Sequence, residues 1–146
     1  MKNFNKAVSK HYKKPNLTVD AVIKKDNSVI LIKRKNNPFK GAWAIPGGFV
    51  EYNETVESAV VREAKEETGL DVKIEKLAGV YSDPKRDPRG HTVSVVFLCG
   101  IIGGKMKADT DASDVREFDI NSLQGIELAF DHRKILREIL LINPTN

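Results

Sequence analysis

Three glutamates, Glu63, Glu66 and Glu67, stand three and four residues apart in the stretch GGFVEYNETVESAVVREAKEETGL, which runs from Gly47 to Leu70. On a helix, residues at these spacings share a face, and their carboxylates repel one another unless protons or cations neutralise them. Oxygen ligands at this density suit hard divalent cations such as Mg²⁺ or Mn²⁺. Because Mg²⁺ bridges carboxylates to phosphates, the pattern predicts a metal site for a diphosphate substrate.

Neighbouring residues could complete such a site. Gly47 and Gly48 allow backbone and phosphate to come close, and a carbonyl oxygen there could add a metal ligand. Arg62 can reach Glu66 four residues further on or fold back to Glu54, and either contact would orient the acids. The alternative interpretation is a solvated glutamate-rich helix face held by ion pairs four residues apart.

A helix must carry these acids, and the sequence predicts one over Thr55–Thr68. Apolar residues recur at helical spacing along it: Val56, Ala59, Val60 and Ala64. Asn53 or Glu54 is expected near its N-cap, and Gly69 is placed to end it. The acidic face then lies about 100° around the helix from the apolar face.

The remaining elements are mostly strands. Strands are predicted over Leu17–Lys25, Ser28–Lys35, Asp71–Asp83 and His91–Ile102, with a short strand before Pro46 that the glycines break and another that begins within Asp114–Asp119. A helical turn is expected at Asn121–Gly125 and a terminal helix at Asp131–Ile142, with Ile135, Leu136, Ile139 and Leu140 inward. This order predicts an α+β fold, an α/β/α sandwich in which helices cover a mixed sheet.

Length and composition favour a single globular domain over residues 1–146, with a basic, loosely held segment at 1–15. No apolar run approaches the roughly 18 residues of a membrane span, and the first residues lack the apolar segment of a signal peptide. The lone Cys99 rules out an intramolecular disulfide and suits a reducing compartment, so a cytoplasmic location without membrane contact is expected.

Charge is unevenly distributed along the chain. Residues 1–40 carry eleven Lys and Arg against two Asp, a net of +9, and the remainder carries a net of −5. The basic segment could be a nucleic-acid footprint. Its lysines lack interleaved aromatics and do not cluster on a helix face, so solvated surface lysines are the favoured interpretation.

The acidic stretch resembles the Nudix box, GX5EX7REUXEEXGU, in which U is an aliphatic residue. Gly48, Glu54 and the segment Arg62–Leu70 fill every fixed position. The resemblance implies an α/β/α sandwich with a catalytic loop-helix-loop motif. It also implies hydrolysis of a nucleoside diphosphate linked to another group, with Mg²⁺ as cofactor and Mn²⁺ as a substitute.

The resemblance also assigns roles within the box. Metal ligands would be Glu63, Glu66 and Glu67, joined by a carbonyl oxygen of Gly47 or Gly48, and Glu54 and Arg62 would form a supporting ion pair. In some family members a glutamate of the box is the catalytic base, and in others it is an acid on a downstream loop. Here that loop is ADTDASDVREF, which offers Asp111 and Asp114, with Glu117 as a weaker third. Loop acids that cap a turn are the alternative.

A second candidate site lies in YSDPKRDPRGHTVSVVF, which spans Tyr81–Phe97. Arg86 and Arg89 could grip a phosphate with paired donors. Asp87 could accept from ribose hydroxyls or hold an arginine in place, and Tyr81 offers a stacking face. The alternative is an Asp-Pro turn with solvated arginines.

Other rings are less informative. Trp43 and Phe39 would either line a nucleoside pocket or pack under the sheet, and Phe130 is expected in the core. His91 is expected to position its loop rather than to act as an acid or base.

The segment SDPKRDPRGHTVS resembles the S-x-P-x-RDPRGH-x-VS pattern of the ADP-ribose pyrophosphatase subgroup of the Nudix family, as do KKPNLTVDAVI and AFDHRKILREIL. This resemblance implies hydrolysis of ADP-ribose to AMP and ribose 5-phosphate. Three alternatives remain: a house-cleaning nucleoside triphosphate pyrophosphohydrolase, a non-catalytic ADP-ribose-binding domain, and an RNA-binding or decapping protein. The oligomeric state stays open, and in a homodimer one chain could complete the other's pocket.

Overall fold

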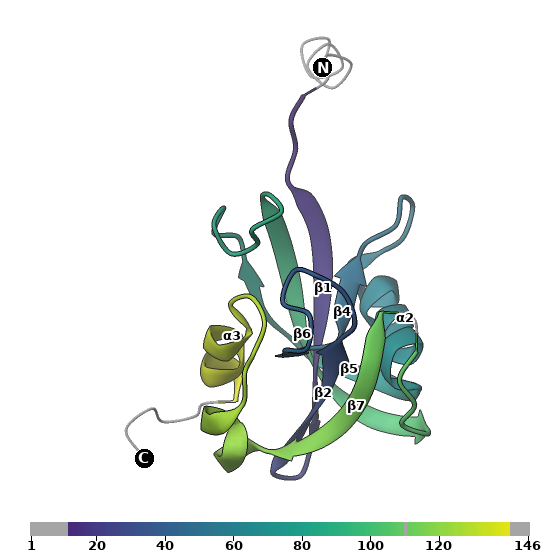
Figure 1. Cartoon of the computed structure of the whole chain (residues 1–146). Coiled ribbons are helices and arrows are strands. Elements are labelled where there is room, and N and C mark those ends of the chain that lie inside the picture. Colours follow the sequence, from purple (N-terminus) through teal and green to yellow (C-terminus); the bar gives the residue numbers. More distant parts are fainter. Residues whose placement is uncertain (1–11, 110, 141–146) are drawn as a thin grey trace.

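The alternating, β-branched residues at the start of the chain form β1 (Asn16–Lys25), which lies at the centre of a seven-stranded mixed sheet. The computed structural model describes residues 12–109 and 111–140 (Figure 1). β1 pairs in parallel with β6 (Thr92–Gly104) and antiparallel with β2 (Ser28–Arg34). The strand order is β3-β2-β1-β6-β5, where β3 is Trp43–Ala44 and β5 is Leu70–Tyr81, while β7 (Ala112–Asp119) pairs with β2.

The two glycines before the acidic helix form a strand of their own, β4 (Gly47–Phe49). It pairs antiparallel with β1 in the register Thr18 to Phe49, Val19 to Gly48 and Asp20 to Gly47. The prediction that the glycines break the strand was therefore wrong. β2 pairs with β1 only at Lys24–Lys25, so the other half of that β1 edge is available, and backbone pairing needs no side chain.

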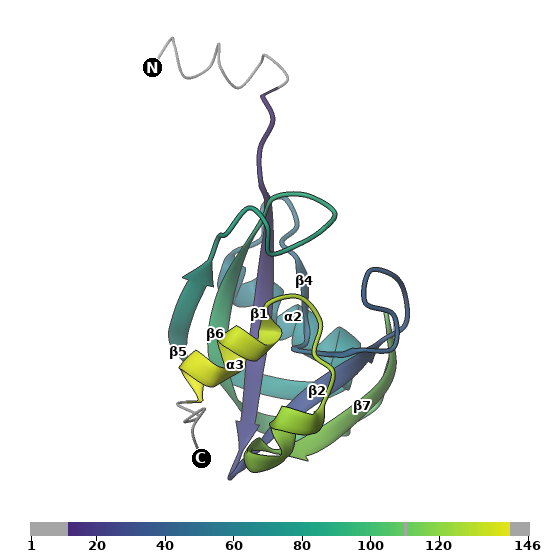
Figure 2. The same cartoon turned by 60° about the vertical axis from the view of Figure 1, so that its left-hand side comes forward.

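Helices cover both faces of the sheet, as Figures 1 and 2 show. On one face, α2 (Val56–Thr68) buries Ala59, Val60 and Ala64 against Val19, Ala21 and Ile23 of β1. On the other face, α3 (His132–Ile139) buries Ile135 and Leu136 with Val22, Val96 and Leu123, the last from the 3₁₀ turn η1 (Ile120–Gly125). The alternation of β1 residues between the two cores follows from the two-residue period of a strand. The predicted α/β/α sandwich is confirmed.

The ends of α2 differ from the prediction at one terminus. Its N-cap is Thr55, whose hydroxyl accepts a 3.0 Å hydrogen bond from the N–H of Ser58. Asn53 and Glu54 lie just before this N-cap, as expected, but neither caps the helix: Asn53 takes a left-handed turn conformation and the Glu54 carboxylate bonds Arg62. At the other end Gly69 caps the helix, as predicted.

Parts of two predicted segments lie outside the described residues: 1–11 of the basic terminal segment, and 141–142 of the predicted terminal helix. β7 begins at Ala112, two residues before the predicted strand, and β6 continues to Gly104. Within the described ranges, no helix is both long and apolar enough to cross a membrane.

Candidate active site

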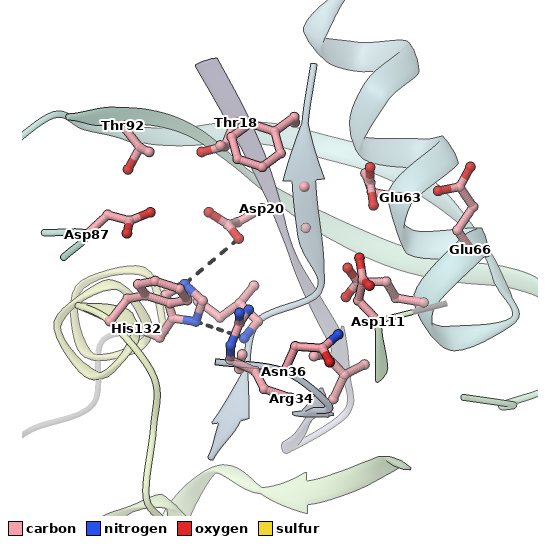
Figure 3. Close-up of a pocket in the computed structure, with 18 of the residues that line it drawn as sticks. Thr18, Asp20, Arg34, Asn36, Glu63, Glu66, Asp87, Thr92, Asp111 and His132 are labelled. Atoms are coloured by element: carbon pink, nitrogen blue, oxygen red, sulfur yellow. Dashed lines mark hydrogen bonds and ion pairs between the residues drawn. The ribbon is translucent and has the colours of Figure 1, made fainter. Parts of the chain in front are cut away.

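A pocket of about 510 Å³ lies between α2 and the start of α3, over strands of the sheet. Figure 3 shows Glu63 and Glu66 of α2 on one side, and Asp87, Thr92 and His132 on the opposite side, with Asp20 of β1 between them. β2, β4 and the β5–β6 loop also contribute to its lining. The elements therefore bring the acidic box and the arginine-rich loop, distant in sequence, to one cavity.

Arg62 ties the acidic box together. Its Nε and Nη2 donate to the two oxygens of Glu54 at 2.6 and 2.8 Å, and these bonds lower the pKa of Glu54 to about 2. Its Nη1 donates to Glu63 at 2.8 Å and to Glu66 at 3.1 Å. Both alternative contacts predicted for Arg62 occur together. Nη2 also donates to the Phe49 carbonyl at 3.1 Å, so the helix is fixed to β4 as well.

Within the acidic box, the carboxyl of Glu67 is the one whose ionisation burial disfavours most. It is 7% exposed, and burial, followed by the charge of Glu63, raises its pKa to about 9 despite a backbone hydrogen bond from Gly47. Burial also raises the pKa of Glu63. Gly48 leaves room for this acid, because a Cβ at position 48 would displace the Glu63 carboxyl from its present place.

The carboxylate oxygens of Glu63, Glu66 and Glu67 suit a hard divalent cation, because such ions prefer oxygen ligands. In the part of the chain that the structure describes, no three His, Cys, Asp or Glu side chains converge as a preformed metal site. Arg62 holds Glu63 and Glu66, while Glu67 bonds to Gly47. Gathering these ligands around one ion would therefore require carboxylate rotations.

The downstream loop contributes one acid to the pocket. Asp111 lines the cavity, and its charge is among those that raise the pKa of Glu67. Asp114 does not line it, because its carboxylate accepts from the N–H of Val115 at 2.8 Å and from Arg116 at 2.9 Å. Glu117 lies 3.8 Å from Lys25, at an exposed position. Of the acids predicted on this loop, geometry thus favours Asp111 over Asp114.

Arg86 lines the pocket, but three of its five N–H donors already bond to neighbouring side chains. Its side chain is 5% exposed, and its Nε and Nη2 donate to Asp131 at 3.0 and 2.8 Å while Nη1 donates to Thr92 at 2.9 Å. The expectation that Arg86 grips a phosphate needs correction, because the β5–β6 loop folds against the start of α3 and places Asp131 opposite it. Arg86 instead fixes the wall of the pocket.

Asp87 holds Arg89 in place. The carboxylate of Asp87 accepts from the backbone N–H of Arg89 at 2.9 Å and from its guanidinium at 2.8 and 3.1 Å. Burial alone would raise the pKa of Asp87, but the bonds from Arg89 outweigh burial and lower it. Of the two roles predicted for Asp87, the contact with an arginine is the one present.

Aromatic rings surround the second arginine. The Arg89 guanidinium carbon lies 5.8 Å from the ring centre of Phe49 and 5.6 Å from that of Phe130, and Arg34 lies 5.0 Å from Phe130. Phe130 was expected in the core, and it does pack, partly buried, against the core cluster around Ile32 and Ala44, but it also lines the pocket, at a turn into α3 where its φ is 52°. The Phe39 ring contacts the Phe130 ring at a tilted angle of 60°, with the two ring centres 4.9 Å apart, and Phe39 itself is not among the residues that line the pocket.

Three other aromatic residues have structural contacts. The Tyr81 hydroxyl donates to Glu138 at 2.6 Å, and Tyr81 packs against the core under α3 rather than lining the pocket, so it is misplaced for stacking on a substrate there. Trp43 packs edge-on against Phe118 at 4.8 Å. His91 Nε2 lies 3.0 Å from the carbonyl oxygen of Ser82, which agrees with a loop-positioning role.

Sequence reasoning missed two buried groups in the pocket, Asp20 and His132. Burial raises the pKa of Asp20 to about 6, although the hydroxyl of Ser94 donates to its carboxylate. Burial lowers the pKa of His132 to about 3, and its Nδ1 accepts from the N–H of Ile45 at 3.0 Å. A single acid inside the apolar strand LTVDAVI was the available signal, since an isolated buried carboxylate is costly.

Comparison with known proteins places the chain among related sequences and structures. Residues 14–139 match the NUDIX domain family. The chain is 58% identical over 129 residues to an ADP-ribose pyrophosphatase of Methanocaldococcus jannaschii, covering 88% of this chain and 75% of that protein.

Two solved structures resemble the fold closely. One is a bifunctional NMN adenylyltransferase/ADP ribose pyrophosphatase from Francisella tularensis complexed with AMP and a Mn ion. It has a TM-score of 0.81 and 30% identity, over 96% of this chain and 45% of that one. The other is the NUDIX domain of Shewanella oneidensis NrtR complexed with ADP ribose. It has a TM-score of 0.78 and 27% identity, over 92% of this chain and 94% of that one.

Proposed function

Since the chain belongs to the NUDIX domain family, we propose that it is a hydrolase that cleaves the diphosphate bond of ADP-ribose to give AMP and ribose 5-phosphate. The observation that carries this proposal is the 58% identity to an ADP-ribose pyrophosphatase across 129 residues. Neighbouring structures that hold ADP ribose, or AMP with a Mn ion, support it.

The proposed cofactor is Mg²⁺, with Mn²⁺ as a substitute. Glu63, Glu66 and Glu67 would hold it, together with a carbonyl oxygen of Gly47 or Gly48. When bound, a divalent ion neutralises diphosphate charge and lowers the pKa of a water molecule. The ion pair between Arg62 and Glu54 holds α2 and its acids in position.

Hydrolysis needs a base for the attacking water. Asp111 is the proposed base on the downstream loop, and a box glutamate, Glu63 or Glu66, is the alternative. The water oxygen forms a bond to phosphorus as the bridging phosphorus–oxygen bond breaks, and the base accepts the water proton. The two products are monophosphate esters, AMP and ribose 5-phosphate.

Arg89 is the residue of the β5–β6 loop that we propose contacts a phosphate group or the adenine ring of the substrate. Its side chain is 46% exposed while Asp87 holds it over the pocket, so a ligand can reach the guanidinium. Arg86 acts through Asp131 and Thr92 as a positioning residue.

A substrate panel tests the proposal. ADP-ribose, NADH, ADP-sugars, dinucleoside polyphosphates and nucleoside triphosphates including 8-oxo-dGTP are each incubated with Mg²⁺ or Mn²⁺, and products are separated by chromatography. ADP-ribose should have the highest kcat/KM, with AMP and ribose 5-phosphate released in equal amounts. Background turnover of ADP-ribose beside brisk turnover of triphosphates would instead assign a house-cleaning triphosphate hydrolase.

The remaining proposals concern the context of the enzyme. The intact acidic box favours turnover over simple sensing of ADP-ribose, because sensing does not need three metal-binding acids. A homodimer and a cytoplasmic location stay proposals, the latter because the buried thiol of Cys99 suits a reducing compartment. Binding of nucleic acid is not part of the proposed function.

A further inference from the structure

A hydrogen-bond donor and an acceptor face each other across a short gap in the pocket. His132 Nε2 lies 3.9 Å from Asp20 Oδ1 (Figure 3). Both side chains line the cavity, and the two residues are only 4% and 7% exposed. A direct hydrogen bond spans about 2.7–3.2 Å, so the gap is too wide for these two atoms to satisfy each other.

Neighbouring groups fix which atom donates and which accepts. His132 Nδ1 accepts from the N–H of Ile45 at 3.0 Å, so the neutral ring carries its proton on Nε2. On the facing side chain, Asp20 Oδ2 accepts from the hydroxyl of Ser94, which leaves Oδ1 for the pocket. The pair therefore presents one donor and one acceptor to whatever lies between them.

One hydroxyl group matches this gap. A hydroxyl oxygen placed about 2.8 Å from each atom would accept from His132 Nε2 and donate to Asp20 Oδ1. A carbonyl oxygen could not donate, an ammonium group could not accept, and a phosphate oxygen would meet the carboxylate of Asp20. Water can fill the same position, and a ligand hydroxyl that displaces it keeps both hydrogen bonds.

The position of the gap points to the part of the substrate that supplies the hydroxyl. Asp20 pairs with Gly47 across β1 and β4, and a Cβ at position 47 would collide with Asp20 Oδ1. The gap therefore adjoins the proposed diphosphate and metal site. In ADP-ribose the two riboses are joined directly to the diphosphate, whereas the purine lies one sugar further away.

We propose that Asp20 and His132 form a subsite for one ribose hydroxyl of the substrate. This inference rests on the proposed function and adds a specificity determinant to it. Ser94 and Ile45 orient the pair, and the Arg86–Asp131 ion pair holds the residue that precedes His132.

Binding of monodeoxy ligands tests the subsite. Dissociation constants for AMP and ADP-ribose are measured by calorimetry in metal-free buffer, beside analogues that each lack one ribose hydroxyl. Product inhibition by the same monophosphates, and by ribose 5-phosphate and its 2-deoxy analogue, is measured with Mg²⁺. One deoxy position should weaken binding by about tenfold or more, because a buried donor and acceptor lose their partner.

Two variants then assign that loss to the pair. In Asp20→Asn the side-chain oxygen can still accept from Ser94, and in His132→Asn the amide oxygen can still accept from Ile45, so each keeps its structural contact. Each variant should reduce the difference in affinity between the parent ligand and the sensitive deoxy analogue, because the ligand hydroxyl loses its acceptor in the first variant and its donor in the second. Asp71→Asn, which alters an exposed acid paired with Lys65, is the matched control and should behave as wild type.

Other results would overturn the subsite. If wild type binds every deoxy analogue as tightly as its parent ligand, no ribose hydroxyl is recognised. If the loss of affinity for the deoxy analogue persists in both variants, the recognised hydroxyl binds at another place in the pocket. Weaker binding of IMP than of AMP that disappears in Asp20→Asn would assign the pair to the purine edge instead. Normal ADP-ribose turnover in either of the first two cases refutes the subsite alone, whereas no ADP-ribose turnover at all refutes the proposed function and the subsite with it.

Discussion

At the scale of single residues, burial decides the chemistry of the pocket. Glu67, Asp20 and His132 are each less than a tenth exposed. Burial raises the pKa of the two acids and lowers the pKa of His132, so in each case it favours the neutral form. Such groups are costly to a fold that uses them only for stability. A substitution at each of these residues is therefore expected to affect activity and stability differently.

Glu67→Gln should lower kcat with Mg²⁺ by at least about 100-fold, since a proposed metal ligand is lost. In metal-free buffer at pH 7 the same variant should melt at a higher temperature than wild type, because Glu67, with its pKa raised to about 9, must take up a proton on folding, whereas the amide is neutral in both states. Steady-state kinetics and calorimetry measure the two effects. Glu57→Gln, at an exposed position of α2, is the control, and full activity in Glu67→Gln would contradict the ligand assignment.

His132 predicts a pH dependence of stability. Its pKa is lowered to about 3 in the folded chain against about 6.5 when unfolded, so the unfolded state alone takes up the proton between these values. This histidine should therefore cost nothing above pH 6.5 and reduce the free energy of unfolding by up to about 1.4 kcal/mol per pH unit below it. His132→Asn should lose that part of the slope in urea titrations at pH 4–8. Parallel curves for the two proteins would refute the assignment.

At the scale of elements, contacts between distant segments build the site. α2 is joined to β4 through Arg62 and the Phe49 carbonyl, and the β5–β6 loop is joined to α3 through Arg86 and Asp131. The second contact is buried at Arg86, so it closes one wall of the pocket. Loss of the contact between Arg86 and Asp131 should therefore lower the stability of the protein and weaken substrate binding.

Arg86→Ala should destabilise the fold by roughly 3 kcal/mol, because it leaves Asp131 without its bidentate partner. The double variant with Asp131→Ala should lose less than the sum of the two single changes, which denaturant titrations measure. Arg116→Ala, from an exposed ion pair with Asp114, should cost less than about 1 kcal/mol. Additive effects of Arg86 and Asp131 would show that the pair is not coupled.

At the scale of the whole molecule, the fold keeps repelling acids together before a cation arrives. Arg62 supplies part of the missing positive charge to Glu54, Glu63 and Glu66, and the two helix layers hold the sheet on either side. The stability of the protein is therefore expected to depend on divalent ions.

Addition of Mg²⁺ or Mn²⁺ should raise the melting temperature of wild type, since an ion that binds only the folded state stabilises it. At ten times its Kd the gain is about 1.4 kcal/mol. The shift should be absent in Glu67→Gln and should be reversed by EDTA in wild type. NaCl at matched ionic strength separates binding from screening, and an equal shift with NaCl would refute a specific site.

Local sequence was sufficient for α2, for the strands other than β4, and for picking out the candidate metal-binding acids. Apolar spacing at Ala59, Val60 and Ala64 and the glycine at position 69 set the helix, because these are effects of neighbouring residues. The spacing of Glu63, Glu66 and Glu67 pointed to a cation site for the same reason, and its role as a ligand set stays a prediction.

Tertiary structure alone decided what surrounds those acids. β4 forms at Gly47–Phe49 only because β1 offers it a free edge. Arg86 turned from a predicted phosphate ligand into a wall residue because Asp131, 45 residues away, lies opposite it. Asp20 and His132 meet for the same reason: a strand and a helix far apart in sequence pack across one pocket, and neither residue's neighbours in the chain determine its partner in space.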